Sequence, residues 1–519
     1  MLRRYALATQ LWVITAIPNI KMQQFLKIAR GFSSPAILIV VVWCVTLIGV
    51  AVGPIDYSSQ PSVAVLALVA SGVSLFILAH QGGAWCFRIW LRQRPNLRTP
   101  PVQLLNLAVA ASSMLGLAGI ALIGLDRSVL SGVGNGGYAE LLRCAPSLVD
   151  FIEIRRTPLL YLGYLTFSFG FASLVLFLLR GEEIRGWSAI LAQLSVLSPV
   201  GYALLYSGRM PILFVIVLIV AAMLVRVGQG RRPLPHGHHL LIKMAVVLLL
   251  FGIYSSAMWS SRQAFCVRMS GLIGELQDRM KEGGSSISAA DLSKMVEEAN
   301  ALPGADQQAH SADAAAPLAS MPQAWHVRPR EYVLSAIESN FLSPGAAMGA
   351  LRTYFYLTHG IRVIDLTWHA RAQFTPHWGV YEVGILSPIL RVFFPQNQTL
   401  ASMSTQLRSA EIYGFFPTVW AAAYIDFGMA GAVIYILIWG FAAGWSTFGA
   451  RHSALALPAL LLTFILASIL LSPVQGPLGI ANSAMVLVSL VIVGMAIDLA
   501  SLDAGFGRQH RELKAGPAV

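Results

Sequence analysis

The side chains best suited to chemistry gather late in the chain, in the run TWHARAQFTPHWGVYEVGILSPILRVFFPQ. His377 and Glu382 follow Arg371 in this run, and Arg408 comes shortly after it. A histidine or carboxylate near arginines is suited to taking the proton of a hydroxyl beside a phosphorylated leaving group. We treat His377 and Glu382 as candidate bases, although each of them, taken alone, is better explained by a solvated loop position.

Asp426 is a third candidate base, and it directly precedes an apolar segment in AAAYIDFGMAGAVIYILIWG. The same position also suits an N-cap of the next helix, or an anchor for the aromatic residues that surround it. The structural roles are the stronger interpretation, so Asp426 is a residue to test and not an assigned base.

Arg209 opens an apolar segment in LLYSGRMPILFVIV, where a very short loop would hold its guanidinium near the membrane surface. A guanidinium binds phosphate through two parallel hydrogen bonds and stays charged. Arg371 and Arg408 are the other candidate ligands for a diphosphate. A snorkelling or orientation-setting arginine is the alternative for Arg209.

Motif searches exclude several kinds of chemistry. The sequence has no P-loop, no H-E-x-x-H, no C-x-x-C and no D-x-D, so we expect neither a cofactor nor a metal. The run GVGNGG at 132–137 has no strand before it and indicates a flexible turn. The net charge of +12 is divided among many short segments, which argues against nucleic-acid binding.

The composition predicts the elements that must position these residues. With 56% hydrophobic and 12% charged residues and a mean hydropathy of +0.66, the chain is typical of an all-α polytopic integral membrane protein. Apolar runs long enough to span a bilayer predict about ten transmembrane helices. They lie at 36–53, 62–80, 103–125, 158–179, 186–205, 209–226, 240–260, 428–449, 454–473 and 480–499.

The distribution of Lys and Arg predicts the topology of these spans. Basic residues concentrate in segments such as 88–98 and 226–232, which places both termini in the cytoplasm. Asp426 then lies at the outer face, unless 412–427 forms a full span and inverts the order. The predicted regions are a cytoplasmic amphipathic N-terminus 1–35, a membrane block 36–260 of seven spans, a periplasmic segment 261–427, a second block 428–499 of three spans and a cytoplasmic tail 500–519.

The outer segment changes in composition along its length. Residues 283–322 are rich in small and polar residues and predict a mobile insert, with one helical patch at SAADLSKMVEEANAL that starts with a plausible N-cap serine. REYVLSAIESNFLS and GAAMGALRTYFYLTH predict helices that lie at the membrane interface. Cys144 and Cys266 both fall on the outer side, where a disulfide between them is one open option.

Three patches of this sequence resemble one family. YSGR opening a span, then HWGVYEVGILSPILRVFFP, then FPTVWAAAYIDFGMAGAVIYILIWG are similar to the bacterial oligosaccharide repeat-unit polymerases, the Wzy-type O-antigen and exopolysaccharide polymerases. The sharpest match is Tyr424–x–Asp426–Phe427–Gly428–x–x–Gly431. Its predicted periplasmic segments lack the R-x10-G motif described for some members, and they lack the His–Asn signature of the related O-antigen ligases.

The resemblance implies a GT-C-like glycosyltransferase of the bacterial inner membrane that acts at the periplasmic face without a metal. Its substrates would be undecaprenyl-diphosphate-linked oligosaccharides, which it would polymerise with inversion into O-antigen or exopolysaccharide. A chain-length regulator and a flippase are the implied protein partners. On this view Arg209, Arg371 and Arg408 bind the diphosphate, and the base is one of His377, Glu382 and Asp426.

Three other functions remain open. An exporter of polysaccharide or of lipid-linked oligosaccharide would also have many spans, but it would more often show internal repeats and charges within its spans. An O-antigen ligase would share the substrate and the membrane face. A non-catalytic scaffold would tolerate the loss of every candidate arginine.

Overall fold

The computed structural model of the chain is mostly helical. It describes residues 30–514 except 59, 94–98, 131–140, 142–143, 146–147, 149–151, 154–156, 207, 209, 236–248, 251, 255–264, 267–268, 283–286, 302–320, 322–325, 385, 395–398, 413–416 and 480. The expectations for the N-terminus before residue 30, for Arg209 and for the end of the tail fall outside these residues.

Eight helical segments of the described part are long and apolar enough to cross a membrane, which confirms a polytopic all-α membrane protein. They are formed by α3 (Pro35–Val52), α4 (Val63–Arg92), α5 and η1 (Val102–Leu125 and Asp126–Leu130), α7 and α8 (Pro158–Phe167 and Phe169–Arg180), α9 and α10 (Trp187–Leu194 and Leu197–Leu205), α11 (Met210–Gly228), α22 (Val419–His452) and α24 (Ala481–Lys514). The shorter apolar helix α23 (Ala456–Leu471) corresponds to the predicted span 454–473. Most of 240–260 lies outside the described residues, so the count of ten stays a prediction.

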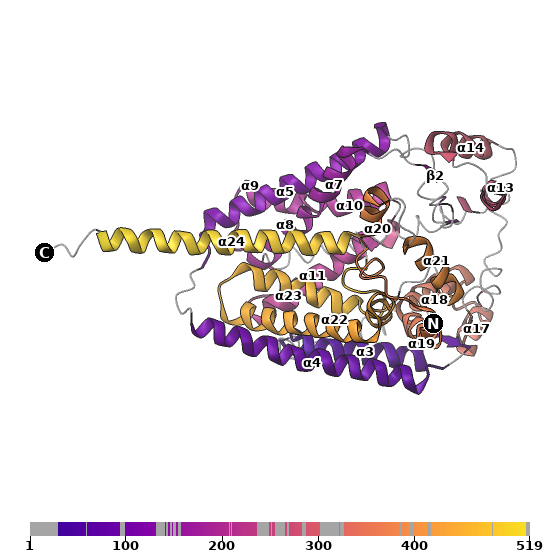
Figure 1. Ribbon diagram of the computed structural model, residues 1–519, viewed down its shortest axis with the longest axis horizontal. Helices are drawn as coiled ribbons and strands as arrows, with labels where there is room; N and C mark the ends of the chain where they lie inside the picture. The colour runs from indigo at the N-terminus through magenta and orange to yellow at the C-terminus, as the bar shows by residue number, and fades with distance from the viewer. Residues whose placement is uncertain are drawn as a thin grey trace, which may run out of the picture.

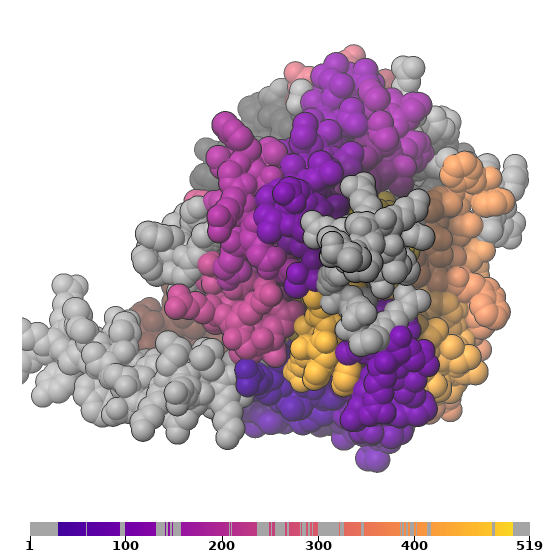
Figure 2. Space-filling model, turned by 90° about the vertical axis from the view of Figure 1, so that its left-hand side faces the viewer, coloured from indigo at the N-terminus to yellow at the C-terminus, as the bar shows by residue number. Residues whose placement is uncertain are grey.

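Small residues let the helices of this bundle approach closely. A Cβ added to Gly444 of α22 would lie 1.7 Å from the carbonyl oxygen of His80, and one added to Gly83 of α4 would lie 2.0 Å from that of Phe441. Such close backbone contact is typical of helices that pack within a membrane. Seen end-on in Figure 2, violet segments from early in the chain and yellow-orange segments from late in the chain lie side by side, in agreement with the packing of α4 on α22.

The remaining elements gather at one end of the bundle, which we call the covered end (Figure 1). The C-terminal part of α24 extends from the opposite end (Figure 1). The covered end consists of α13 (Ser270–Lys281), α14 (Ala289–Ala301), α17 (Glu331–Glu338), α18 (Pro344–Thr358), α19 (Gly360–His369), η3 (Arg371–Gln373), α20 (Leu386–Phe393) and α21 (Thr399–Ser409), with the strand pairs β1 (Ile55–Tyr57) with β4 (Val327–Pro329) and β2 (Ile152–Glu153) with β3 (Ile287–Ser288).

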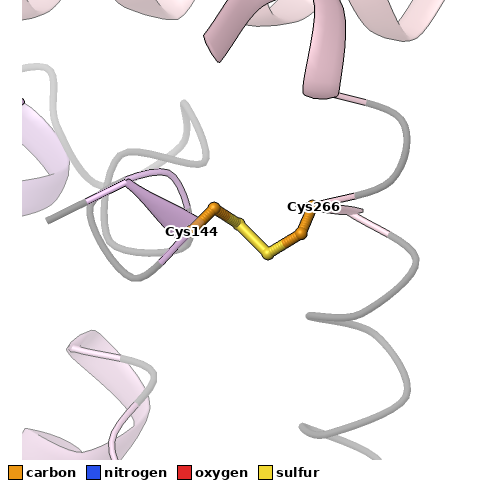
Figure 3. Close-up of a disulfide and its surroundings, with 2 residues drawn as sticks. All are labelled: Cys144 and Cys266. Carbon is orange, nitrogen blue, oxygen red and sulfur yellow. A yellow bond between two sulfur atoms is a disulfide. The ribbon is translucent and has the colours of Figure 1, made fainter. Parts of the chain in front are cut away.

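A second, small hydrophobic core lies at the covered end, apart from the core of the bundle. The disulfide Cys144–Cys266 joins two of its segments (Figure 3), which answers the question that the sequence left open. The helix expected in the 283–322 insert is α14, and the Ser288 hydroxyl both caps it, by accepting from the Asp291 N–H, and donates to the Asp291 carboxylate. The buried members of this core are Leu141, Ala145, Leu148, Phe265, Met269, Leu276, Leu292 and Val296.

Candidate functional site

Helix α22 reverses direction at Gly428, and this reversal positions the candidate site. Gly428 has φ 63° and ψ −172°, a combination that is essentially restricted to glycine. On the N-terminal side of Gly428, the Trp420 ring packs on Gly72 of α4. On its C-terminal side, Gly440 packs on Phe76, which lies only one helical turn further along α4. Twenty residues of continuous helix would separate the two contacts by about 30 Å. Residues 419–427 therefore form a short arm that runs back against the rest of α22.

The arm begins inside the bundle. The centroids of the Trp420 and Trp43 rings are 5.5 Å apart, and Trp43 lies in the middle of α3. The Trp43 indole N–H donates to the Ser472 hydroxyl (3.1 Å), and the Val419 N–H donates to the Ser472 carbonyl (3.1 Å). The connection between α23 and α24 thus also lies at this depth without helical structure. Non-helical backbone is tolerated in a membrane only where protein or a water-filled cavity surrounds it, and transporters build their binding sites from such broken helices.

Asp426 lies at the C-terminal end of the arm and holds the turn that contains the other two candidate bases, His377 and Glu382. Its carboxylate accepts hydrogen bonds from the backbone N–H groups of Tyr381 (3.0 and 3.1 Å) and Glu382. Its carbonyl oxygen accepts from the N–H groups of His377 and Trp378, at 2.9 Å each. The N-cap of α22 is Thr418. Among the roles that the sequence allowed, the geometry agrees with a structural one, although Asp426 secures a distant turn and does not cap its own helix.

Glu382 is the candidate whose geometry suits proton transfer. It is fully buried, and its Oε1 accepts from the Tyr435 hydroxyl and from the Leu478 N–H (3.3 Å). Its Oε2 has no hydrogen-bond partner within the described chain. Burial away from water disfavours the carboxylate and raises the pKa of Glu382 to about 8. At neutral pH this side chain is therefore mostly protonated, with a minor ionised fraction.

The carboxyl of Glu382 fits against a glycine. A Cβ added to Gly476 would lie 2.0 Å from Oε2, so the carboxyl occupies the space that a side chain at residue 476 would take. Gly476 lies in the connection between α23 and α24, which also pairs with the turn through the Gly384 N–H and the Leu478 carbonyl (3.1 Å). Three segments, the turn 377–384, the arm 419–427 and the connection 472–479, therefore meet at Glu382: the arm bonds to its backbone N–H and the connection to its carboxyl.

His377 is buried in the same turn, but its ring is already engaged. Its Nε2 lies 3.0 Å from Gln406 Oε1, which also accepts from the Thr375 N–H (3.3 Å). Because a backbone N–H can only donate, this atom of Gln406 is the amide oxygen, and His377 Nε2 must carry a hydrogen. Through this nitrogen His377 fixes the turn to α21 and does not act as a base.

The candidate arginines are less concentrated. Arg371 is exposed, its guanidinium lies 4.6 Å from the centroid of the Trp368 ring, and it donates to the Trp368 carbonyl (2.9 Å). Arg408 is exposed in the last turn of α21. The Ser409 hydroxyl in the same turn donates to Gln373 Oε1 (3.1 Å), which joins α21 to η3. The structure thus places Arg371 and Arg408 on the outer rim of the turn. Arg209 lies outside the described residues.

Several residues that complete the site were not candidates from the sequence. Tyr435 stands in an apolar run, Gln406 in a polar helix and Gly476 in the short sequence QGPLG, which interrupts two apolar runs. Of these three, only the interruption at Gly476 is visible in the sequence, as a non-helical connection between two apolar helices. Within the described ranges, His, Cys, Asp and Glu form no group of three that could hold a metal ion.

Comparison of the chain with models of protein families, with curated proteins and with solved structures finds no match. The function is therefore inferred from the residues of the site.

Proposed function

We propose that the chain is a metal-independent, inverting glycosyltransferase that polymerises undecaprenyl-diphosphate-linked oligosaccharide units. The observation that carries the proposal is Glu382, a buried carboxyl whose Oε2 has no partner within the described chain. It stands where three non-helical or reversed segments meet at one end of an apolar bundle. The similarity of three sequence patches to the repeat-unit polymerases supports the choice of substrate.

In the proposed topology the covered end faces the periplasm and both termini are cytoplasmic. The disulfide Cys144–Cys266 at the covered end supports this orientation, because disulfides persist in oxidising compartments such as the bacterial periplasm. The basic segments 88–98 and 226–232 then face the cytoplasm, as the positive-inside rule requires. The membrane is the bacterial inner membrane, where lipid-linked units reach the outer face.

In the proposed reaction, ionised Glu382 takes the proton of the acceptor sugar hydroxyl at Oε2. The hydroxyl oxygen forms a bond to the anomeric carbon of the donor, and the bond from that carbon to the diphosphate oxygen breaks with inversion. A pKa of about 8 suits a base, because proton transfer is most efficient when the pKa lies near the working pH. Asp426 positions the turn, and Tyr435 fixes the rotamer of Glu382.

The departing diphosphate needs positive charge in place of a metal. Arg371 and Arg408 lie on the rim of the turn, and Arg209 is expected at the start of α11. Guanidinium groups can bind a diphosphate through paired hydrogen bonds and stabilise its developing charge. Replacing these residues by lysine keeps the charge but removes the paired geometry, so a contact of this kind should be weakened even by Lys.

The proposal is tested in a null strain complemented with variants of equal membrane abundance. Glu382→Gln keeps the size of the side chain and an oxygen for Tyr435, but it removes the base, so single lipid-linked units should accumulate. Asp498→Asn is the control, because Asp498 is another buried carboxylate; it accepts the backbone N–H groups of Ala456 (2.7 Å) and Leu457 (3.0 Å). Full-length polymer from Glu382→Gln would refute the role of Glu382, and units that never reach the periplasm in the null strain would favour an exporter.

A further inference from the structure

One short helix at the covered end presents large apolar side chains to its surroundings. In α20, Ile389 is 39% exposed and Phe393 is 71% exposed. Phe394, whose N–H still donates to the Leu390 carbonyl (2.8 Å), is 59% exposed. Ile389 and Phe393 are four residues apart, so they lie on one face of the helix. Large apolar side chains that gather on a surface in this way mark a contact with a membrane or with another protein.

Two other helices of the covered end expose polar groups instead. The exposed side chains that the structure describes in α21 are Ser402, Thr405, Arg408 and Ser409. Those in α14 are Asp291, Lys294, Glu297 and Glu298. Water suits the outer faces of α14 and α21, whereas the exposed face of α20 suits an apolar environment.

The depth of α20 follows from the contacts of the turn just before it. The Gly384 N–H donates to the Leu478 carbonyl (3.1 Å), and the Tyr435 hydroxyl donates to Glu382, so the turn is fixed to two parts of the bundle. Sixteen residues of helix, at most about 24 Å, separate Tyr435 from Arg451 in the last turn of α22. Because the hydrocarbon of a bilayer is about 30 Å thick, the turn meets α22 near the edge of the hydrocarbon.

The short length of α20 keeps it close to the same edge. It begins at Leu386, two residues after Gly384, and it is at most about 12 Å long. In Figure 1, α20 lies at the border between the bundle and the covered end. Its exposed face is therefore continuous in depth with the ends of the membrane-spanning helices.

Trp378 provides a second observation in the same turn. Its side chain is 78% exposed, and its backbone has φ 54°, a conformation that bulky residues rarely adopt. Its N–H donates to the Asp426 carbonyl (2.9 Å), which helps to hold the residue in this position. Tryptophan is enriched where a membrane meets water, because the ring is apolar and its N–H is polar. The exposed indole thus fits the environment that suits the exposed face of α20.

From these observations we infer that α20 is an interfacial helix that enters the lipid leaflet at the covered end. Its exposed face, Ile389, Phe393 and Phe394, contacts the acyl chains, and Trp378 lies at the depth of the headgroups. Continuity with the lipid-facing ends of the bundle favours lipid over a second copy of the chain. The turn that carries Glu382 is then held between the bundle and the bilayer. This contact goes beyond the proposed reaction and holds for any function of a chain that spans the membrane.

Spin-label accessibility tests the lipid contact. The full-length protein, with Cys44 and Cys86 replaced by alanine, carries a nitroxide at Phe393→Cys in vesicles of phosphatidylethanolamine and phosphatidylglycerol. Collision of the nitroxide with molecular oxygen reports hydrocarbon, and collision with a water-soluble nickel chelate reports water. Two reference positions bracket the result, Ile438→Cys at a 61% exposed position of the span α22 and Lys294→Cys at an exposed position of α14.

We expect the label at Phe393 to behave as the label at Ile438 does, with frequent oxygen collisions and few nickel collisions, and Lys294 to show the reverse. Frequent nickel collisions at Phe393 would place α20 in water and overturn the inference. Few collisions with both reagents would mean that protein covers the helix, which would overturn it as well. Distances between labels on different molecules, measured by electron–electron double resonance, would then show whether the cover is a second copy of the chain.

A charged substitution measures whether the apolar face itself makes the contact. With the label at Phe394→Cys, Phe393→Asp should raise nickel collisions toward the level found at Lys294, because a carboxylate resists transfer into lipid. Lys294→Asp with the same label is the control, and it should leave the collisions at residue 394 unchanged. Folding of each variant is checked by formation of the Cys144–Cys266 disulfide and by elution as a single species. Unchanged collision rates in well-folded Phe393→Asp would contradict a lipid contact made by this face.

Discussion

Replacing Gly476 by alanine tests whether the position of the Glu382 carboxyl matters. The added methyl would lie 2.0 Å from Oε2, 2.3 Å from Oε1 and 2.4 Å from Cδ of Glu382. Because Cβ atoms essentially never come within 3.0 Å of such neighbours, the carboxyl must move by at least about 1 Å. That movement disturbs the hydrogen bonds to Tyr435 and to the Leu478 N–H.

We expect Gly476→Ala to lower the polymerisation rate about 100-fold, the effect that a 1 Å misplacement of a reacting group can have. Overpacking of this kind should cost about 1–3 kcal/mol of stability, which a well-packed bundle tolerates. The assay measures the rate of polymer formation from purified lipid-linked units in vesicles. Gly349→Ala is the control, since Gly349 lies in α18 and a Cβ there meets no atom within 4 Å.

A double-mutant cycle identifies the cause of the effect. If the methyl acts by displacing the carboxyl, then Gly476→Ala should cost almost no stability in a Glu382→Ala background, where that carboxyl is gone. The two substitutions should therefore be strongly non-additive. A wild-type polymerisation rate in Gly476→Ala would refute the idea that the absence of a side chain at residue 476 accommodates Glu382. Losses of stability that simply add in the double variant would refute it as well.

Three further outcomes are expected. Burial raises the pKa of Glu382 to about 8 from an ordinary value of 4.5, so its contribution to stability is fully present below about pH 4.5 and is lost as the pH rises through 8. The polymerisation rate should rise over the same range toward pH 8, because the ionised form is the base. Thermal unfolding and rates measured from pH 5 to 9 should both lose this pH dependence in Glu382→Gln. Asp426→Asn leaves one oxygen, or an amide NH₂, facing the backbone N–H groups of the turn, so it should lower the free energy of unfolding by about 1–3 kcal/mol and abolish polymerisation. Asp498→Asn should lower the free energy of unfolding by a similar amount but leave polymer formation intact. Equal loss of polymer in both variants would contradict a local role for Asp426. Replacing Cys144 and Cys266 by serine opens a loop of 122 residues and should cost about 2–5 kcal/mol, measured as a lower unfolding temperature that reductant does not lower further.

The spans could be predicted from the sequence because a bilayer demands long apolar helices whatever their partners are. Eight of the ten predicted spans correspond to helical segments of the necessary length and composition. Even the start of one span at residue 428 coincides with Gly428, since the charge of Asp426 ends the apolar run there. The helix at 289–301 was also visible, because Ser288 and Asp291 form a local capping pattern.

The assembly of the site could not be predicted, because it depends on contacts between residues far apart in the chain. The sequence suggested Glu382 and Asp426 as alternatives for one role, and the structure gives them different surroundings. Asp426 accepts backbone hydrogen bonds with both carboxylate oxygens, whereas Glu382 keeps Oε2 without a partner in the described chain. The role of Tyr435 could not be predicted, because a single tyrosine in an apolar run is common. Its hydroxyl reaches Glu382 through the packing of α22, which reverses at Gly428.

The disulfide sets an order of events during biosynthesis. Cys144 is synthesised 122 residues before Cys266, and on the proposed topology both cysteines reach the periplasm. At roughly 5–20 residues per second, that delay lasts about 6–24 seconds. Cys44 and Cys86 lie within α3 and α4, so neither can pair with the waiting thiol at the covered end. The small core at the covered end can therefore be locked only after the first membrane block has been inserted, and no wrong intramolecular partner competes for Cys144 in the meantime.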